Sequence, residues 1–478
     1  MKSLRLFTLE LGRLLRGRMT WLAAALTLVS PVAGLVLYTP ASAETMLSVY
    51  LANPAIAAGA VGAVLFGLLT IYELDRPARS RVEMLTGAAV SPLTSALVQT
   101  GALICVSLLA ALLTALLWLP ISMALIGEVF DFSDYALAYL IFTALALPLG
   151  VLASASAYQF TRRADLSVVL FAAFAAASLT VWRYNWQLCW LNPCVWALSD
   201  DFSNYRIFRS AAYMRLTWLA VLAGVWTLSW LCVRQYGKGP VGSFARHARR
   251  PLRCAAALLL LACSVLAYTA QPFIDNSNPD ETAMTFFEIP YLEDVVCTGR
   301  SAEVFPNTSS DTVQGTATFT FKNSSGSEQT AAFGVLPGYE IRSVKANGND
   351  AGYTLSDYQE YNEALLEVTL PAEEEIVLTI EYGGFPRENR NTSIMQGGKE
   401  ISSEYICLEN AALSPRLMNV LPDDNMYPAV IEVTLPENMT AIPFGSSDAE
   451  IVSMNPDGTA TWRYEDNGTG GILYAGDY

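Results

Sequence analysis

The sequence predicts a polytopic α-helical membrane domain of about seven spans, followed by an all-β extracytoplasmic sandwich. Long apolar runs fill the first part of the chain, and short segments of alternating polar and apolar residues fill the rest. Up to Phe273 there are 20 Lys and Arg against 11 Asp and Glu, a balance of +9; from Ile274 there are 9 against 33, a balance of −24, and these sum to the net −15. A slightly basic membrane part and an acidic, solvated part are therefore expected.

Seven stretches are apolar and about as long as the ~20 residues that cross a bilayer. They are Met19–Thr39, Pro54–Tyr72, Leu93–Ile126, Tyr135–Tyr158, Leu166–Trp182, Leu216–Val233 and Leu252–Ala270. The expected domains are a cytoplasmic interfacial helix at 1–18, a six-span core at 19–234, a basic loop with the seventh span at 235–272, and the β-sandwich at 273–478. The expected spans carry essentially no ionisable residues, which argues against an ion-driven pump and for energy supplied from elsewhere.

The Lys and Arg residues predict the orientation. The loops at 1–18, 74–92, 159–165 and 234–253 are basic, whereas those at 40–53 and 127–134 have neither Lys nor Arg. The 183–215 loop has four arginines and is the one imperfect fit. By the positive-inside rule the N-terminus is cytoplasmic and everything after Phe273 is extracytoplasmic, in a multi-pass protein of the plasma (inner) membrane.

A charge-rich segment, Glu73–Pro92, separates the second and third spans. It predicts a turn at the cytoplasmic face, because charges at the bilayer centre are costly. The turn is either a solvated loop that only fixes topology or a docking surface for a soluble partner, and its candidate contact residues are Glu73, Asp75, Arg76, Arg79, Arg81 and Glu83. In the span before it, Gly62 and Gly67 each follow an alanine by four residues, a pattern that lets another helix approach closely.

The loop at 183–214 is rich in tryptophan, with Trp182, Trp186, Trp190 and Trp196 suited to the headgroup layer. An ordinary aromatic belt and a short re-entrant helical hairpin are both consistent with it. Cys189 and Cys194 flank part of this loop, and a disulfide there stays open because pairing does not follow from sequence.

The acidic part alternates with period two. The clearest segments are Thr312–Phe321, Leu365–Leu370, Glu375–Tyr382, Ala429–Leu435 and Ala460–Tyr464, with residues 371–374 joining the second to the third. Period two with turn residues between the segments predicts an antiparallel β-sandwich.

The sequence lacks the motifs of P-loop nucleotide binding and of H-E-x-x-H zinc sites. The chain has no G-x-x-x-x-G-K-[ST] and no H-E-x-x-H, and its one histidine, His247, lies among arginines. No enzyme activity, metal or cofactor is predicted, and the acidity argues against nucleic acid as a partner.

Two parts of the sequence resemble known protein families. The amphipathic start LELGRLLRGRMTW precedes two spans that bracket a loop of the form E-x-x-R-x-x-R…L-x-x-x-x-x-S-P, filled by Glu73, Arg76, Arg79, Leu85 and Ser91-Pro92, and LNPCVWAL precedes the last core span. With these features the first 234 residues resemble the membrane subunits of ABC transporters of the type-2, exporter-like permease family. The resemblance implies a coupling helix in the charged loop, docked on a separate ATPase subunit, and a second permease subunit in a homo- or heterodimer.

In the acidic part, LLEVTLPAEEEIVLTIEYGG, NMYPAVIEVTLPENMTAIPFG and DGTATWRY…GILYAGDY are similar to strands of the N-terminal β domain of aminopeptidase N-type zinc metallopeptidases. In that family a catalytic domain with H-E-x-x-H follows, and this sequence does not contain it. The chain is then either a fragment or a form without a catalytic half, and no catalytic residue is carried over.

The sequence therefore favours a permease subunit of an ABC-type exporter, coupled to its ATPase through residues 73–92. Two alternatives stay open. One is a truncated membrane-anchored aminopeptidase-like protein. The other is a membrane tether that presents a binding domain without transport.

Overall fold

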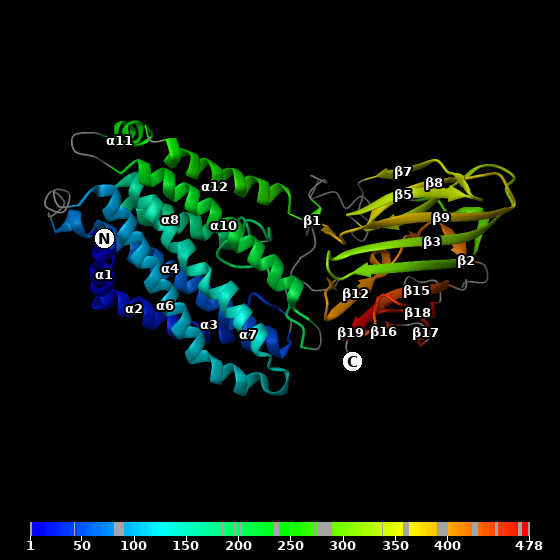
Figure 1. The fold of residues 1–478 in the computed structure, drawn as a ribbon, viewed down its shortest axis with the longest axis horizontal. Helices are drawn as coiled ribbons and strands as arrows, with labels where there is room; N and C mark the ends of the chain where they lie inside the picture. The colour runs from blue at the N-terminus through cyan, green and yellow to red at the C-terminus, as the bar shows by residue number, and fades with distance from the viewer. Residues whose placement is uncertain are drawn as a thin grey trace. The chain divides into compact units, whose positions relative to one another are not determined.

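The computed structural model describes residues 2–42, 44–80, 90–183, 185–195, 197–200, 203–233, 239–249, 251–271, 274–275, 289–336, 338–356, 363–389, 400–422, 429–444, 448–466 and 471–476. The chain divides into two compact units, Met1–Gln271 and Pro272–Tyr478. Figure 1 shows that the first unit is helical and the second consists of β-sheets. The expected division into a helical part and a β part is confirmed.

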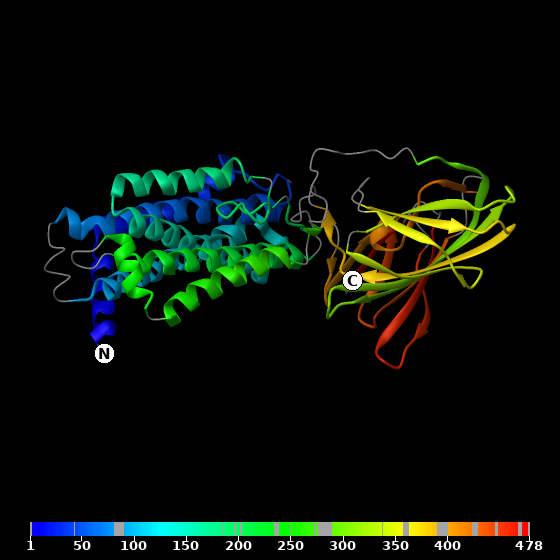
Figure 2. The same cartoon turned by 90° about the horizontal axis from the view of Figure 1, so that it is seen from above.

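The helical unit contains α1 (Lys2–Leu15), α2 (Arg18–Val29), α3 (Pro31–Val36), η1 (Ser48–Ala52), α4 (Asn53–Arg79), α6 (Pro92–Ile126), η2 (Gly127–Val129), α7 (Phe132–Ala138), η3 (Tyr139–Ala144), α8 (Ala146–Thr161), α9 (Ala164–Leu179), α10 (Tyr205–Leu231), α11 (Pro240–His247) and α12 (Pro251–Thr269). Short α1 crosses the end of the bundle that the long helices form (Figure 2). Its apolar side packs on the bundle, where Leu14 is buried.

Five helical segments of the described residues are long and apolar enough to cross a membrane: Arg18–Val36, Ser48–Arg79, Pro92–Val129, Phe132–Thr161 and Tyr205–Leu231. The expected fifth and seventh spans are represented by shorter apolar helices, Ala164–Leu179 and Cys254–Thr269. At 1.5 Å per residue, the 16 residues of α9 rise about 24 Å, less than the ~30 Å hydrocarbon core.

The helices that contain two of the expected spans extend beyond the expected boundaries. The second does not end in a turn at Tyr72, because α4 continues to Arg79. The sixth does not begin at Leu216, because α10 already starts at Tyr205 and so contains Arg206, Arg209 and Arg215. These arginines precede the expected span but lie on the same helix, and no helix forms in the described part of 185–200.

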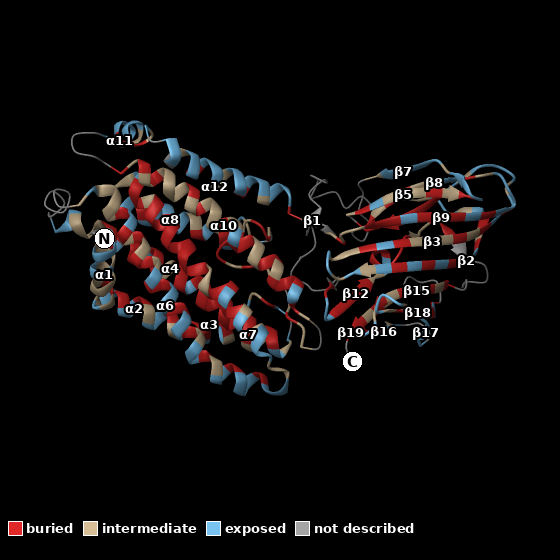
Figure 3. Cartoon of the chain, in the orientation of Figure 1, coloured by how far each residue is buried: buried red, intermediate tan, exposed pale blue. Residues whose placement is uncertain are grey.

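Helices α4 and α8 form the centre of the unit, and most of their residues are buried, whereas α12 is largely exposed (Figure 3). Glycines on α4 lie where neighbours come close. A Cβ at Gly62 would lie 2.8 Å from Leu147 Cδ1, and one at Gly67 would lie 2.8 Å from Ser154 Oγ and closer still to the ring of Phe171. Any side chain at these two positions would push α8 or α9 away from α4.

The β unit has one sheet of nine strands, two of four and one of two in its described residues. The large sheet runs β17 (Glu450–Met454), β18 (Thr459–Asp466), β15 (Ala429–Pro436), β2 (Leu292–Asn307), β3 (Thr312–Asn323), β9 (Glu375–Gly384), β5 (Tyr339–Ala346), β6 (Asn349–Asp350), with β14 (Val420–Pro422) paired to β2. The four-stranded sheets run β11 (Glu400–Ile401), β12 (Tyr405–Glu409), β19 (Ile472–Gly476), β16 (Thr440–Phe444), and β13 (Arg416–Leu417), β4 (Gln329–Val335), β8 (Ala364–Leu370), β7 (Tyr353–Ser356). The two-stranded sheet pairs β1 (Ile274–Asp275) with β10 (Glu388–Asn389).

The expected antiparallel arrangement is corrected in one detail, and the structure also shows which strands residues 371–374 join. The large sheet is mixed, because β2 pairs in parallel with β15 and β14 and antiparallel with β3. Residues 371–374 do not close a hairpin, because β8 pairs with β4 and β7 while β9 pairs with β3 and β5. The chain instead passes there from one sheet to another.

The sheets share one apolar core. Every second residue of β3 is buried, including Phe319, whose ring centroid lies 4.9 Å from that of Phe333 on β4. Leu366 of β8 and Ile406 of β12 belong to the same cluster. Alternation along each strand thus supplies one apolar face, and these faces meet in a common interior.

Candidate functional site

The expected coupling residues lie at the end of α4 where it meets α1. Helix α4 continues to Arg79 although it contains Pro77. Glu73 and Asp75 therefore belong to this helix and not to a loop. Glu73 is 8% exposed. Arg81 and Glu83 lie outside the described residues.

Glu73 is held by α1. Arg13 Nη1 lies 2.8 Å from Glu73 Oε2, and Arg13 Nη2 and Nε donate to Glu10 at 2.7 and 3.0 Å. Burial lowers the pKa of Arg13, but the two carboxylates raise it by more, so the net pKa lies above the ordinary value. A charge as buried as Glu73 requires such a partner, since an unpaired buried charge is strongly destabilising. The pair therefore fastens the amphipathic helix to α4.

Asp75 is held by α8 and by its own helix. Tyr158 on α8 donates its hydroxyl to Asp75 Oδ1 at 3.0 Å, and Arg79 Nε lies 3.0 Å from Asp75 Oδ2. The Arg79 guanidinium also lies over the Tyr72 ring, 4.0 Å from its centroid. Both acidic residues thus connect α4 to neighbouring helices.

The cationic residues are more accessible. The Arg79 side chain is 45% exposed and Arg76 is half-buried, so both present charge at the surface beyond the buried pair. After the undescribed segment, Ser91 begins α6 as an N-cap that accepts a hydrogen bond from the Thr94 amide at 3.2 Å. The structure thus separates the predicted site into inward-facing anchors, Glu73 and Asp75, and outward-facing cations.

Sequence reasoning missed Arg13 as a partner of Glu73, because nothing in the spacing relates residues 60 positions apart. The sequence did, however, indicate that Glu73 could face the interior. It lies four residues after Leu69, which is buried on the same face of α4, so a continued helix turns it inward.

A second polar cluster lies around Arg215, which is fully buried. Its guanidinium donates to the main-chain carbonyl of Trp190 and, at 3.3 Å, to that of Phe142. The segment that carries Trp190 is fastened at its far end by Asp200, which accepts hydrogen bonds from the Met46 and Leu47 amides at 2.7 and 2.8 Å. Trp186 and Trp190 are themselves buried, so the expected headgroup belt is wrong for both.

The thiols of this segment also meet. Cys189 Sγ lies 3.0 Å from Cys194 Sγ, and no disulfide joins the two cysteines in this structure. Cys189 is fully buried, and burial raises the pKa of its thiol well above the ordinary value. Among the described residues no group of three or more His, Cys, Asp or Glu side chains is placed to hold a metal ion.

Comparison with known proteins gave similarity only in structure. No family profile matches the chain, and no curated protein matches it. A solved M1 zinc metallopeptidase from Deinococcus radiodurans is 14% identical, covering 38% of this chain and 42% of that chain with a TM-score of 0.27. Native leukotriene A4 hydrolase from Saccharomyces cerevisiae is 10% identical, covering 38% and 29% with a TM-score of 0.24. The chain thus spans less than half the length of the solved structures it matches.

Proposed function

We propose that this chain is the membrane permease subunit of an ABC-type export system, driven by a separate ATPase that contacts the charged end of α4. The resemblance of residues 1–234 to type-2 permeases supports the proposal. The observation that carries it is the arrangement of that end, where Arg76 and Arg79 are accessible while Glu73 and Asp75 anchor the same turn to α1 and α8.

The anchors give a route for mechanical coupling. Helix α4 has 27 residues and rises about 40 Å, so a displacement at its charged end is carried along the whole element. Because Glu73 binds Arg13 and Asp75 binds Tyr158, α1 and α8 would move together with α4. In this proposal a second permease subunit completes the pathway, and the β unit faces the extracytoplasmic side.

The test is to purify the tagged chain from its native membrane and to identify a partner chain that contains both G-x-x-x-x-G-K-[ST] and an ABC signature. Replacement of Arg76 and Arg79 by Glu should reduce recovery of that partner at least tenfold, because two attractive charges become repulsive. Arg163→Glu is the matched control, since Arg163 is exposed on a neighbouring basic loop and should leave recovery unchanged.

Absence of such a partner would contradict the proposal and would favour the alternative of a membrane tether without transport. Chelator-sensitive release of an N-terminal amino acid by the purified full chain would instead favour the aminopeptidase-like alternative. Recovery that is equal for the Arg76→Glu/Arg79→Glu chain and the wild-type chain would show that the ATPase docks elsewhere.

A further inference from the structure

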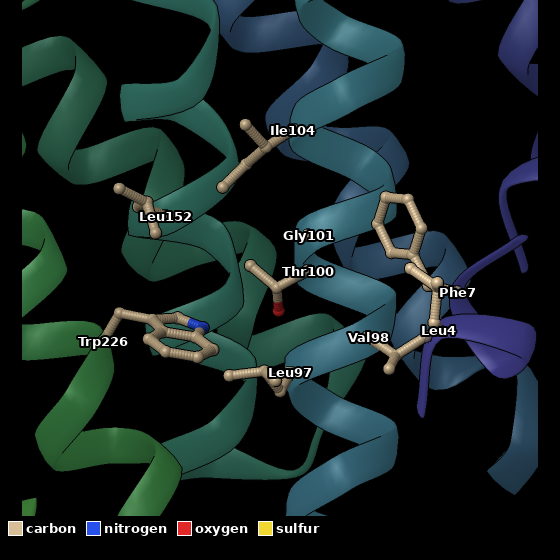
Figure 4. Close-up of a pocket in the computed structure, with 9 residues that line it drawn as sticks. All are labelled: Leu4, Phe7, Leu97, Val98, Thr100, Gly101, Ile104, Leu152 and Trp226. Carbon is tan, nitrogen blue, oxygen red and sulfur yellow. The ribbon is translucent and has the colours of Figure 1, made fainter. Parts of the chain in front are cut away.

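An apolar cavity of about 440 Å³ lies where α1, α6, α8 and α10 meet. Its wall includes Phe7 of α1, Ile104 of α6, Leu152 of α8 and Trp226 of α10, as Figure 4 shows. The volume is in the range of ligand pockets, about 300–1,000 Å³. Among the residues that the structure describes, no charged side chain contributes to its lining.

Two polar atoms of the residues in this wall, Thr100 Oγ1 and Trp226 Nε1, have no hydrogen-bond partner in the described part of the chain. Both atoms are buried, and Thr100 as a residue is only 2% exposed. In Figure 4 the indole nitrogen of Trp226 lies on the side of its ring that is turned toward Thr100. Buried polar atoms without partners are rare and costly, so this pair requires an explanation.

The rest of the unit shows how these groups are normally satisfied. On the same helix, Thr114 donates to the Ala110 carbonyl at 2.8 Å, whereas Thr100 makes no such bond to its own helix. The indole N–H of Trp118 donates to the Leu28 carbonyl at 2.9 Å, and that of Trp230 donates to the Leu93 carbonyl at 2.8 Å. Unlike these side chains, Thr100 and Trp226 have no carbonyl acceptor among the described residues, and both lie at the same cavity.

We propose that this cavity binds one acyl chain of a membrane phospholipid, with the ester carbonyl of that chain accepting hydrogen bonds from Thr100 Oγ1 and Trp226 Nε1. A carbonyl oxygen has two lone pairs and can accept from both donors, while the indole N–H can only donate. The apolar wall suits a hydrocarbon chain, and the absence of a charged lining residue disfavours a ligand whose buried end is ionised. The inference does not depend on the proposed transport function.

Gly101 keeps the space open. A Cβ added there would meet only Phe7 Cε2, at 3.6 Å, so a larger side chain could enter the cavity without displacing the backbone. Gly101→Leu is therefore expected to fill the site while α6 still forms. Gly12→Leu on α1 is the matched control, because a Cβ at Gly12 has nothing within 4 Å.

The experiment uses the full chain, reconstituted in vesicles that contain phosphatidylglycerol with a diazirine in one acyl chain. After illumination, mass spectrometry of the digested protein should place the adduct on the α6 segment around Thr100 and on the α10 segment around Trp226. Gly101→Leu should abolish this adduct, and Gly12→Leu should leave it unchanged. Thr100→Val removes one hydrogen bond at nearly constant shape, so it should lower the adduct about fivefold.

Two results would overturn the inference. One is labelling of the exposed face of α6, at Leu112 and Leu116, as strong as that around Thr100, which would mean lipid bound only at the annulus. The other is undiminished labelling of Gly101→Leu in protein that elutes as a single species with wild-type helical content. Thr100→Val keeps the test decisive if Gly101→Leu does not fold, because loss of one hydroxyl leaves the packing intact.

Discussion

Single residues in the segment between α9 and α10 are fixed by main-chain contacts. Arg215 donates to two carbonyls, the Leu191 amide donates to Ser178 Oγ at 2.9 Å, and the Trp190 ring stacks on Phe174 with centroids 4.8 Å apart. The thiols of Cys189 and Cys194 are therefore held next to each other by structure that does not involve the sulfur atoms. A disulfide needs an S–S separation of about 2.05 Å, roughly 1 Å closer than the 3.0 Å seen here.

We expect mild oxidation to join Cys189 to Cys194. Diamide would take two electrons and two protons from the thiols, and the rate should rise with pH because the thiolate is the reacting species. Alkylation followed by mass spectrometry should then show both cysteines protected, and reduction should restore both. Cys189→Ser should leave Cys194 alkylated, whereas Cys232→Ser should not affect the pair. Full alkylation of Cys189 and Cys194 after oxidation would contradict the prediction.

Among the helices that the structure describes, α1 has a position that rests on a specific charge pair, Arg13 with Glu73. The Arg13 side chain is 29% exposed and that of Glu73 is 9% exposed, so the pair is partly desolvated. It should contribute more than a surface ion pair, about 1–2 kcal/mol, but less than the 3–5 kcal/mol lost when a fully buried pair is broken. Apolar packing of α1, through Leu14 above all, supplies the rest.

Arg13→Met should therefore loosen α1 from α4. Trypsin cleavage after Arg16 or Arg18, which follow α1, should become about five- to thirtyfold faster, the factor that corresponds to 1–2 kcal/mol. Arg5→Met is the control, since Arg5 is exposed on the same helix and should leave cleavage unchanged. Adding Glu73→Gln to Arg13→Met should cost little more, because the partner charge has then been removed as well. Equal cleavage of the Arg13→Met and Arg5→Met chains would show that packing alone positions α1.

Most elements were predictable from sequence, because a pattern along the chain reports which face of an element is apolar. The period-two segments at 312–321 and 375–382 became β3 and β9 nearly as expected. Their partners were not predictable, since alternation does not say which strand lies alongside; the join at 371–374 therefore left open that β8 and β9 pair with other strands. The same limit applied to Glu73 and Arg215, where the charge suggested a loop and only the fold supplied Arg13 and the two carbonyls.

At the scale of the whole molecule, the chain combines a helical unit and a β unit of different charge. The apolar helices are compatible with a membrane protein, and the predicted orientation rests on the distribution of Lys and Arg alone. Ser80, directly after α4, and Ser310, in the turn between β2 and β3, are both exposed and report on the two units.

In a background without accessible cysteine, Ser80→Cys and Ser310→Cys should react oppositely with a membrane-impermeant maleimide added to intact cells. Ser310→Cys should be labelled, and Ser80→Cys should be labelled only after the membrane is permeabilised. The exposed positions make both thiols reactive once the reagent reaches them, so permeabilised cells serve as the positive control. Labelling of Ser80→Cys in intact cells would reverse the predicted orientation.

The place of β2 in the large sheet has a consequence for the order of assembly. One edge of β2 pairs with nearby β3, but the other pairs with β15, so that Arg300 lies beside Ala429 and Val304 beside Val433. Contacts of such long sequence separation form slowly, because the loop must close before the pairing is gained. While the chain emerges from the ribosome or a translocation channel, the second edge of β2 therefore stays unpaired until the residues after 429 have emerged. That unpaired edge is a template for association with other chains, so the interval before β15 arrives is when this unit most needs protection from aggregation.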